Sequence, residues 1–545
     1  IAKNGDDVKL WDHRQPHSAE SWEAIELLEE MLEDDGPIVA HNSAFEETIT
    51  ECLFGKTFNM MPPDADRWTC TAAMCRMAAI PYDLFNASRF LSLKSVKMEA
   101  GTNLIKIFCC PNPQIPKGWD EKAGWETFRT DCIKDVEAER GLYGRLKKSF
   151  ALPREVFRFD ARLNNRGIPV NRDALTKAGV IVDYCMDKLV EEFRAITDLN
   201  PTQREKVLEW LKIRGYPHND LKAASMEAVL DDPPENMDAV ALRALELRAG
   251  SSFASLAKIP VMLAASEHDS RVRGGFMWNG ALRTGRWSGK IIQPQNFKRP
   301  SIKDTHLAYE MIKRGHPIED FTDLWDNGLP EIIASCVRHF IELPGKMMLD
   351  ADFANIEARI TPWLCGQEDM LDEFRLHSRM KEEKGEKAAY EYDPYVIMAA
   401  AIFGVKGKDV TKDQRFVGKT ATLGAQYQIG WRKFQLMCAG YGRKLSDDVC
   451  KLTIEKYRDK RDRIATHWRL YNDAAKEAIR NNGKFAVPVG RVSFRCGKLE
   501  QAGFHALRIT LPSGRILNYP LARLQWVDKK FPDGGTSKME EIQFW

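Results

Sequence analysis

Apolar residues recur every three or four positions over several long stretches of the chain. Residues 173–197 are one example, with Leu175, Val182 and Phe193 in the same series. This spacing places apolar side chains along one stripe of an α-helix, which can then pack against a core. The pattern predicts helices over residues 127–147, 159–166, 173–197, 411–431 and 457–479, and another that begins at Pro201.

Shorter apolar runs bounded by turn residues predict strands. Such runs occupy residues 8–11, 37–41 and 347–349, and residues 507–521 predict a hairpin that turns at residues 512–514. Helices and strands are therefore mixed along the chain, which predicts an α/β fold. The length of 545 residues predicts about three or four domains.

Composition narrows the class of protein. The chain has 80 Lys and Arg residues against 78 Asp and Glu residues, so any surface that binds nucleic acid must be local. Its 12 cysteines include no C-x-x-C pair, which favours reduced thiols over a zinc ribbon or disulfide scaffold. No apolar run approaches the roughly 18 residues that span a bilayer, and no signal peptide opens the chain. We expect a cytoplasmic protein without a membrane partner.

Asp352 is the first candidate for chemistry. It lies where the predicted strand of residues 347–349 ends, and helical spacing begins after it at Asn355. A carboxylate between a strand and a helix can hold a metal ion rigidly against a phosphate. The alternative interpretation is an ordinary turn aspartate.

The predicted helix of residues 411–431 offers a second candidate site. Thr411 and Gln414 fit a capping box at its start. Four residues then follow at intervals of four positions, namely Arg415, Lys419, Leu423 and Tyr427. Two cations, an apolar side chain and a phenol on one stripe suit a nucleoside triphosphate. An ordinary amphipathic helix is the alternative, although Gly418 and Gly424 weaken it and imply another requirement.

Residues 271–303 form a basic segment. They include eight Lys or Arg residues and no Asp or Glu. Interleaved small and polar residues let such a segment approach a phosphate chain closely, which predicts nucleic-acid binding. A solvated basic loop is the alternative.

Acidic residues stand out in the first part of the chain. Asp131, Asp135 and Glu139 share one face of the predicted helix of residues 127–147. Glu46 follows the predicted strand of residues 37–41. The plain interpretation is a solvated acidic face. The alternative is a nuclease site in which Glu46 and Asp135 bind paired metal ions.

Five segments in order resemble the family A DNA polymerases, particularly their phage-encoded branch. These are H-N-S-A-F-E at residues 41–46, D-C-I-K-D-V-E at residues 131–137, T-G-R-W-S with the later Q-N at residues 284–296, R-x-x-x-K with a later Tyr at residues 415–427, and L-P-S-G-R at residues 511–515. The resemblance covers nearly the whole chain. It implies an RNase H-like 3′–5′ exonuclease domain followed by a right-hand polymerase with thumb, palm and fingers.

The resemblance implies domain boundaries and the following roles. The expected parts are an exonuclease-like domain at 1–150, a linker and helical thumb at 151–270, a palm at 271–365, fingers at 366–484 and a palm return hairpin at 485–545. In the polymerase site, Asp352 and the Phe353 carbonyl bind metal, Lys419 also donates a proton, and Arg415, Lys419, Leu423, Tyr427 and Glu357 bind the deoxynucleotide. Glu46 and Asp135 bind metal in the exonuclease, and Arg283, Arg286, Gln295, Asn296 and Arg359 contact DNA.

The implied activity is template-directed addition of deoxynucleotides to a primer 3′-hydroxyl in phage DNA replication. It uses two Mg²⁺ ions per active site, with Mn²⁺ as a substitute, and its partners are primer–template DNA and dNTPs. We expect a monomer in the host cytoplasm. The alternatives are a single-subunit RNA polymerase, which has a small residue where this chain has Glu357, and an exonuclease or DNA-binding protein without polymerase activity.

Some features depart from the family pattern. Asp131 replaces the usual Tyr of the third exonuclease motif. The D-x-E pair of the first exonuclease motif is expected upstream of Ile1. The H-D-E turn that carries the second polymerase carboxylate is expected beyond Trp545. The family pattern gives Asp350 no role.

Overall fold

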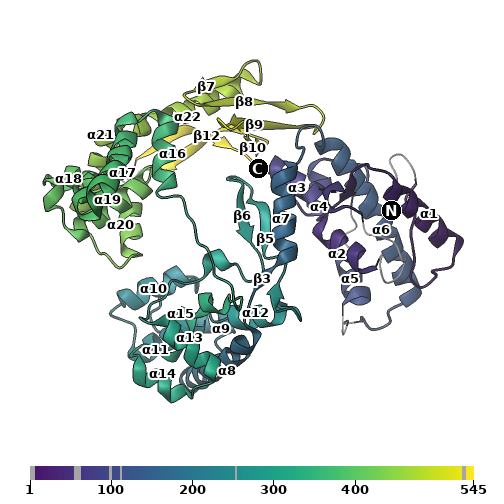
Figure 1. Ribbon diagram of the computed structural model, residues 1–545, viewed down its shortest axis with the longest axis horizontal. Helices are drawn as coiled ribbons and strands as arrows, with labels where there is room; N and C mark the ends of the chain where they lie inside the picture. Colours follow the sequence, from purple (N-terminus) through teal and green to yellow (C-terminus); the bar gives the residue numbers. More distant parts are fainter. Residues whose placement is uncertain are drawn as a thin grey trace. The chain divides into compact units, whose positions relative to one another are not determined.

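The computed structural model describes residues 7–53, 63–96, 101–110, 113, 115–251, 255–530 and 535–545. The chain divides into two compact units. Unit 1 comprises Ile1–Leu152, Leu282–Gly285 and Asp350–Trp545, and unit 2 comprises Pro153–Ala281 and Arg286–Leu349. The range expected to form the palm, residues 271–365, therefore contributes to both units. Figure 1 shows the helices and strands of each.

The first part of unit 1 surrounds a short parallel strand pair with helices. β1 pairs with β2, and Ile38 lies opposite Trp68, which confirms the strand expected at residues 37–41. Residues 8–11 form no strand; Lys9 there pairs with Glu23 at 2.5 Å. The elements are α1 (Ala19–Glu33), β1 (Ile38–Ala40), α2 (Ala44–Leu53), η2 (Ala65–Arg67), β2 (Trp68–Cys70), α3 (Thr71–Ala78), α4 (Leu84–Phe90), α5 (Gly101–Cys109) and α6 (Glu121–Leu146).

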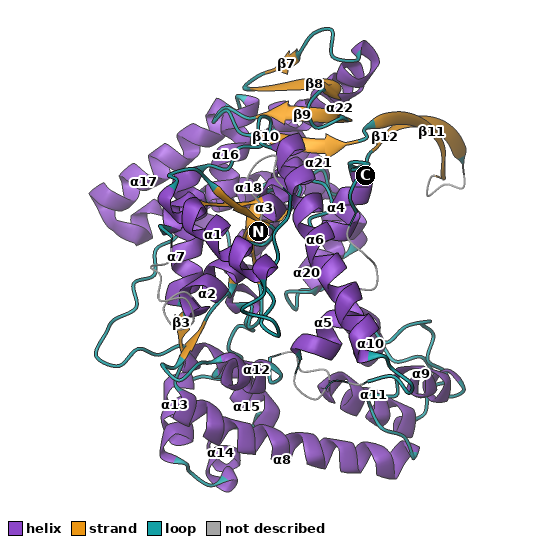
Figure 2. Cartoon of the chain, turned by 90° about the vertical axis from the view of Figure 1, so that its right-hand side faces the viewer, coloured by secondary structure: helices purple, strands orange, loops and turns teal. Residues whose placement is uncertain are grey.

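The second part of unit 1 contains a helical group and an antiparallel sheet. The sheet has the strand order β10-β9-β8-β7, and β11 pairs with β12 as a separate hairpin (Figure 2). The elements are α16 (Ile356–Cys365), α17 (Glu368–Ala389), η5 (Tyr390–Tyr392), α18 (Pro394–Phe403), η6 (Gly407–Asp409), α19 (Lys412–Ala425), α20 (Trp431–Ala439), α21 (Asp447–Lys460), α22 (Asp462–Asn481), β7 (Val487–Val489), β8 (Val492–Leu499), β9 (Phe504–Thr510), β10 (Ile516–Pro520), β11 (Arg523–Lys530) and β12 (Thr536–Gln543).

Apolar packing joins the two parts of unit 1. Ala474 and Ala478 of α22 pack against Phe494 of the sheet. At the other end of the sheet, Phe150 stacks on Phe504 with ring centroids 6.5 Å apart. These aromatic and aliphatic contacts remove apolar surface from water, which is the main favourable term in folding. The sheet is therefore the common support of both parts.

Two sequence predictions near the sheet have different outcomes. The hairpin expected at residues 507–521 is confirmed as β9 and β10, with Gly514 at φ 79° in its turn. The single helix expected over residues 457–479 is wrong, because the chain breaks between α21 and α22 at Arg461. The Arg461 side chain is fully buried and bonds Asp369 at 3.0 Å and Glu373 at 2.5 Å. Sequence periodicity cannot reveal this long-range ion pair.

Unit 2 is mainly helical. Its long helix α8 joins two cores: Leu175 and Val182 belong to the first, and Phe193 belongs to the second. This confirms the helix predicted over residues 173–197. The elements are α7 (Arg154–Arg166), β3 (Ile168–Pro169), α8 (Arg172–Thr197), α9 (Arg204–Lys212), α10 (Ala223–Asp231), α11 (Ala239–Ser251), α12 (Lys258–Ala265), β4 (Arg271–Val272), β5 (Phe276–Ala281), β6 (Arg286–Gly289), η3 (Pro294–Asn296), α13 (Thr305–Arg314), α14 (Ile318–Leu324), α15 (Leu329–Ser335) and η4 (Val337–Phe340).

The segment before α16 differs from its prediction. Residues 347–349 form no strand, and Met347 and Leu349 are each 91% exposed. A strand needs a neighbour to pair with its backbone N–H and C=O groups, and none of the described strands pairs with this run. The expectation of a buried strand is therefore wrong for this structure. In the described parts of the chain, no helix is long and apolar enough to cross a membrane.

Candidate functional site

The start of α19 is built as the sequence predicts. Thr411 Oγ1 accepts from the Gln414 backbone N–H at 3.2 Å, and Gln414 Oε1 accepts from the Thr411 N–H at 2.9 Å. This capping box satisfies backbone donors that the first turn leaves unpaired. The helix ends at Ala425, earlier than the predicted residue 431. Tyr427 therefore lies just beyond the helix, and its side chain is 58% exposed.

The two faces of α19 have different environments. Val417 and Ala421 are buried in a core that also contains Met398 of α18. Lys419 and Tyr427 are exposed on the other side. Gly418 explains how closely the helices pack, because a Cβ atom there would lie 2.2 Å from the Tyr395 carbonyl oxygen. The predicted polar stripe is thus presented outward by a firmly packed helix.

Arg415 is tied to the start of α18. Asp393 Oδ2 accepts from Arg415 Nε at 2.8 Å and from Nη2 at 2.6 Å. The Asp393 Oδ1 atom accepts from the Tyr395 backbone N–H at 2.9 Å and so caps α18. Tyr395 Oη in turn donates to Asn355 Oδ1 at 2.8 Å. These bonds connect the stripe on α19 to the residue that precedes α16.

α16 also meets α19 through apolar packing. Leu423 packs against a core that includes Ala358 of α16 and Phe374 of α17. The Arg359 guanidinium lies 4.6 Å from the centre of the Phe374 ring, and its Nε donates to the Ala354 carbonyl at 3.1 Å. Glu357 lies in the first turn of α16. The structure therefore brings the sequence-predicted residues of α16 and α19 into one region.

Asp352 and Phe353 lie in the exposed segment that leads to α16. Asp350 is also exposed there. A carboxylate and a backbone carbonyl are the hard oxygen donors that Mg²⁺ prefers. Among the residues described, no group of three His, Cys, Asp or Glu side chains is arranged to hold a metal ion. The donor chemistry of Asp352 and Phe353 fits Mg²⁺ as part of a ligand set.

Three carboxylates interact in the first part of unit 1. Glu46 projects from α2, and Asp135 and Glu139 project from α6. Burial raises the pKa of Glu46 to about 7. Burial, with further contributions from the Glu46 and Asp135 carboxylates, raises the pKa of Glu139 to about 8. A cation nearby would relieve this mutual repulsion, although these three carboxylates do not form a described group arranged to hold a metal ion.

Asp131, the residue that departs from the exonuclease motif expected from the sequence, faces α5. Its side chain is 1% exposed. A Cβ atom on Gly101, the first residue of α5, would lie 2.0 Å from Asp131 Oδ2. The close approach of this carboxylate requires glycine at that position. Asp131 is therefore packed against the start of α5, on the same helix as Asp135.

The basic segment is partly engaged within the protein. Arg273 pairs with Asp269 at 2.6 Å, and Lys298 pairs with Glu331 at 2.6 Å. Arg283, in unit 1, lies 4.9 Å from the centre of the Phe544 ring. These contacts show that several cations of the segment have structural partners. Because acids outside residues 271–303 pair with some of these cations, the segment offers DNA fewer cations than its sequence suggests.

Three further residues expected to contact DNA, Arg286, Gln295 and Asn296, lie in unit 2, whereas Arg359 lies in unit 1. Arg286 opens β6 and is exposed. The Gln295 side chain lies against Gly289, where a Cβ atom would be 2.1 Å from its Nε2 atom. Asn296 Nδ2 donates to Gln293 Oε1 at 3.0 Å. Gln295 and Asn296 are thus held beside the end of β6.

Comparison with known proteins identifies the family. Residues 243–495 match the family model described as DNA polymerase family A. A DNA polymerase of Bacillus phage SP02 is 30% identical over 508 residues, which cover 90% of this chain and 73% of that protein. The chain belongs to the family A DNA polymerases. It is accordingly a DNA-directed DNA polymerase, as the sequence motifs predict.

A solved structure is also similar to the polymerase. It is the POL domain of Pol1 from M. smegmatis, in complex with DNA primer-template and dNTP. The alignment has 15% identity and a TM-score of 0.47, and covers 86% of this chain and 70% of that chain. The family-model match includes Asp352 and α19 but not Glu46 or Asp135.

Sequence reasoning missed two residues that lie beside the candidate site. Asp393 and Tyr395 connect Arg415 to Asn355. The only local signal was Asp393-Pro394, which is typical of a helix start. The partnership with Arg415 spans 22 positions and depends on how α18 packs against α19.

Proposed function

We propose that this polymerase extends a primer along a DNA template by attack of the primer 3′-hydroxyl on the α-phosphate of a bound dNTP. The observation that supports these site assignments is the bonded series from Arg415 through Asp393 and Tyr395 to Asn355. It couples the candidate nucleotide-binding helix to the segment that carries Asp352. Residues distant in sequence can in this way act on one nucleotide.

The proposed roles follow from the chemistry of each side chain. Arg415 and Lys419 bind the triphosphate, because cations form charge-assisted hydrogen bonds with phosphate oxygens. Lys419 Nζ also gives a proton to the pyrophosphate leaving group. Leu423 and Tyr427 line the space that the base and sugar occupy. Glu357 excludes a ribose 2′-hydroxyl. Bound Mg²⁺, with Asp352 and the Phe353 carbonyl among its ligands, supplies stabilisation of charge on the attacking and leaving oxygens.

The proposed architecture is a thumb, palm and fingers, with Arg283, Arg286, Gln295, Asn296 and Arg359 at the DNA. Small polar residues and cations in this set suit contact with a sugar–phosphate backbone. Primer extension on a defined primer–template with four dNTPs tests the proposal. Lys419→Ala should slow extension strongly, whereas Lys451→Ala, which changes an exposed lysine of α21 that pairs with Asp448, should not. Equal loss in both variants would contradict the assigned stripe.

We also propose a 3′–5′ exonuclease activity, supported by the raised pKa values of Glu46 and Glu139. Buried carboxylates that repel one another suit a site whose working form includes a divalent cation. The test is release of nucleotides from a 3′-labelled single strand. Asp135→Asn should abolish release, and Glu137→Gln, on the same helix and paired with Arg140, should retain it. If Asp135→Asn still releases nucleotides as wild type does, the proposal is wrong.

A further inference from the structure

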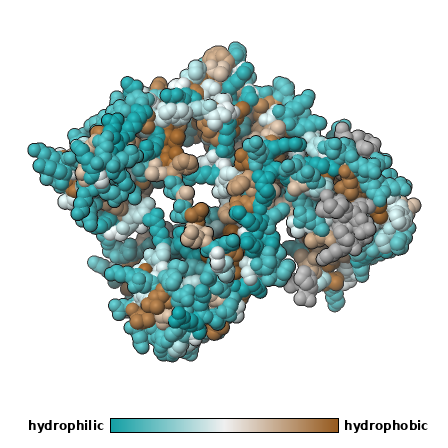
Figure 3. Space-filling model, in the orientation of Figure 1, coloured by the Kyte–Doolittle hydropathy of each residue, from teal (hydrophilic) through white to brown (hydrophobic). Residues whose placement is uncertain are grey.

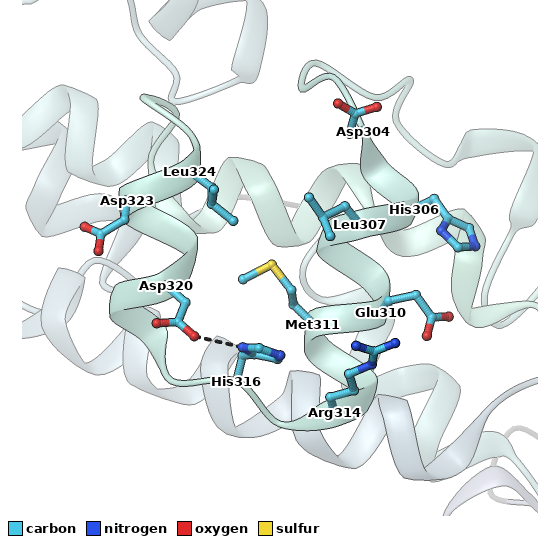
Figure 4. A pocket seen from close by; sticks show the side chains of 10 residues that line it. All are labelled: Asp304, His306, Leu307, Glu310, Met311, Arg314, His316, Asp320, Asp323 and Leu324. Carbon is cyan, nitrogen blue, oxygen red and sulfur yellow. Dashed lines mark hydrogen bonds and ion pairs between the residues drawn. The ribbon is translucent and has the colours of Figure 1, made fainter.

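A groove lies in unit 2, between α13 and α14. It has a volume of about 660 Å³ and is lined by side chains of both helices and of the turn that joins them (Figure 4). None of the polymerase or exonuclease residues named above lines it. Because all its walls belong to one compact unit, its shape is defined within that unit.

The inside of the groove is apolar. Leu307 of α13 and Leu324 of α14 are 48% and 57% exposed, and Met311 lies buried between them. Figure 4 shows these three side chains directed into the space between the helices. Most of the surface in Figure 3 is hydrophilic, with hydrophobic patches among it. These two exposed leucines on facing helices therefore offer apolar surface that another molecule could cover.

The rim of the groove is acidic. Four acids line it (Asp304, Glu310, Asp320 and Asp323), against one arginine, Arg314. Residues 304–326 contain six Asp or Glu side chains and two Lys or Arg side chains. Two of these acids are paired, since His316 Nδ1 lies 2.8 Å from Asp320 Oδ2 and Lys313 Nζ lies 3.2 Å from Glu310 Oε1. Asp304 and Asp323 remain exposed. Acidic side chains outnumber basic ones in this lining, which favours cationic groups over anionic ones at the groove.

We propose that this groove binds an amphipathic helical segment of a partner protein that has apolar residues on one face and Lys or Arg beside them. The apolar face would contact Leu307, Met311 and Leu324. The flanking cations would face Asp304 and Asp323. A groove between two helices suits a third helix, which places anchors at i, i+3, i+4 and i+7. Opposite charge on the rim raises the association rate and selects against acidic partners.

The test uses the whole polymerase and a fluorescent peptide of about 18 residues, long enough for five helical turns. The peptide has Leu at the anchor positions and Lys elsewhere, and a matched peptide has Glu in place of Lys. Binding is followed by fluorescence anisotropy at two salt concentrations. Wild type should bind the Lys peptide, more weakly at high salt, and should not bind the Glu peptide.

Paired variants separate specific docking from general attraction. Leu307→Ser with Leu324→Ser removes the anchors without changing charge, and should weaken binding roughly ten-fold or more. Val180→Ser with Ile213→Ser is the control, because these exposed residues of unit 2 (67% and 83%) lie outside the groove. Asp304→Asn with Asp323→Asn should weaken binding and reduce its salt dependence. Primer extension should be unchanged in all three double variants.

Three results would overturn the proposal. The first is equal binding by wild type and the Leu307/Leu324 double variant. The second is equal weakening in the Val180/Ile213 control. The third is self-association of the polymerase that the Leu307/Leu324 double variant abolishes, since the groove would then receive a second copy of this chain.

Discussion

Asp393 holds Arg415 through a single carboxylate oxygen, with Oδ2 at 2.8 Å from Nε and 2.6 Å from Nη2. The Asp393 side chain is 9% exposed and that of Arg415 is 35% exposed. A triphosphate that binds Arg415 must therefore compete with a sheltered carboxylate. The same carboxylate caps α18 through its other oxygen, so charge and cap can be separated by substitution.

Asp393→Asn should lower the KM for dNTP by roughly 3- to 10-fold, because Asn keeps the cap but removes the charge that competes with phosphate. Steady-state primer extension measures KM and kcat separately. Asp413→Asn is the matched control, since Asp413 pairs with Arg443 on the exposed side of α19. An unchanged or higher KM in Asp393→Asn would mean that Asp393 orients Arg415 for the nucleotide.

Glu357→Ala should raise the incorporation of ribonucleotides relative to deoxynucleotides by at least about ten-fold, because the smaller side chain leaves room for a 2′-hydroxyl. The ratio of kcat/KM for the two nucleotides measures the effect. Glu368→Ala, at the start of α17, provides a control. If the ratio stays the same in both variants, Glu357 has no part in sugar selection.

The carboxylates of α2 and α6 predict a dependence of stability on pH. Their pKa values in the folded protein, about 7 for Glu46 and about 8 for Glu139, lie above the value of about 4.3 for an unfolded chain. The folded state therefore holds more protons than the unfolded state, and the free energy of unfolding falls as pH rises from about 5 to about 8.

Glu139→Gln should remove part of this fall, and so should be more stable than wild type by roughly 2–4 kcal/mol near pH 9, with little difference near pH 5. Urea denaturation at several pH values measures it. Added Mg²⁺ should stabilise wild type more at high pH than at low pH. If the free energy of unfolding changes with pH in the same way in wild type and Glu139→Gln, the raised pKa of the Glu139 side chain is contradicted.

Gly418→Ala should destabilise the protein by about 1–3 kcal/mol, because its Cβ would meet the Tyr395 carbonyl oxygen and the helices would have to separate. Gly144→Ala is the control in the same unit, since nothing lies within 4 Å of a Cβ there. That exposed change within α6 should stabilise by about 0.5–1 kcal/mol. Denaturant unfolding compares the two, and equal effects would refute the close packing of α18 and α19.

Local rules predicted the elements with strong periodicity. The long helix α8, the capping box of α19 and the hairpin of β9 and β10 are set by side-chain spacing and turn chemistry within a few residues. Sequence also indicated that Gly418 serves a purpose other than helix propensity. The close contact with α18 supplies that purpose, but its partner could not be named without the fold.

Long-range relationships escaped prediction. The pairing of Arg415 with Asp393 and the break at Arg461 both depend on side chains many positions away. The apolar run at residues 347–349 resembled a buried strand, yet it is exposed because no described strand pairs with it. A strand is stable only beside a partner, and sequence spacing does not reveal whether one is present.

The most direct test of the account is primer extension by Asp352→Asn beside Asp350→Asn. The two aspartates are two residues apart in the same exposed segment, so either change should leave the fold intact. If Asp352 is the carboxylate that binds metal, Asp352→Asn should lose at least about a thousand-fold in kcat, while Asp350→Asn stays within a few-fold of wild type. If Asp352→Asn extends the primer as fast as wild type does, the proposed active site is contradicted.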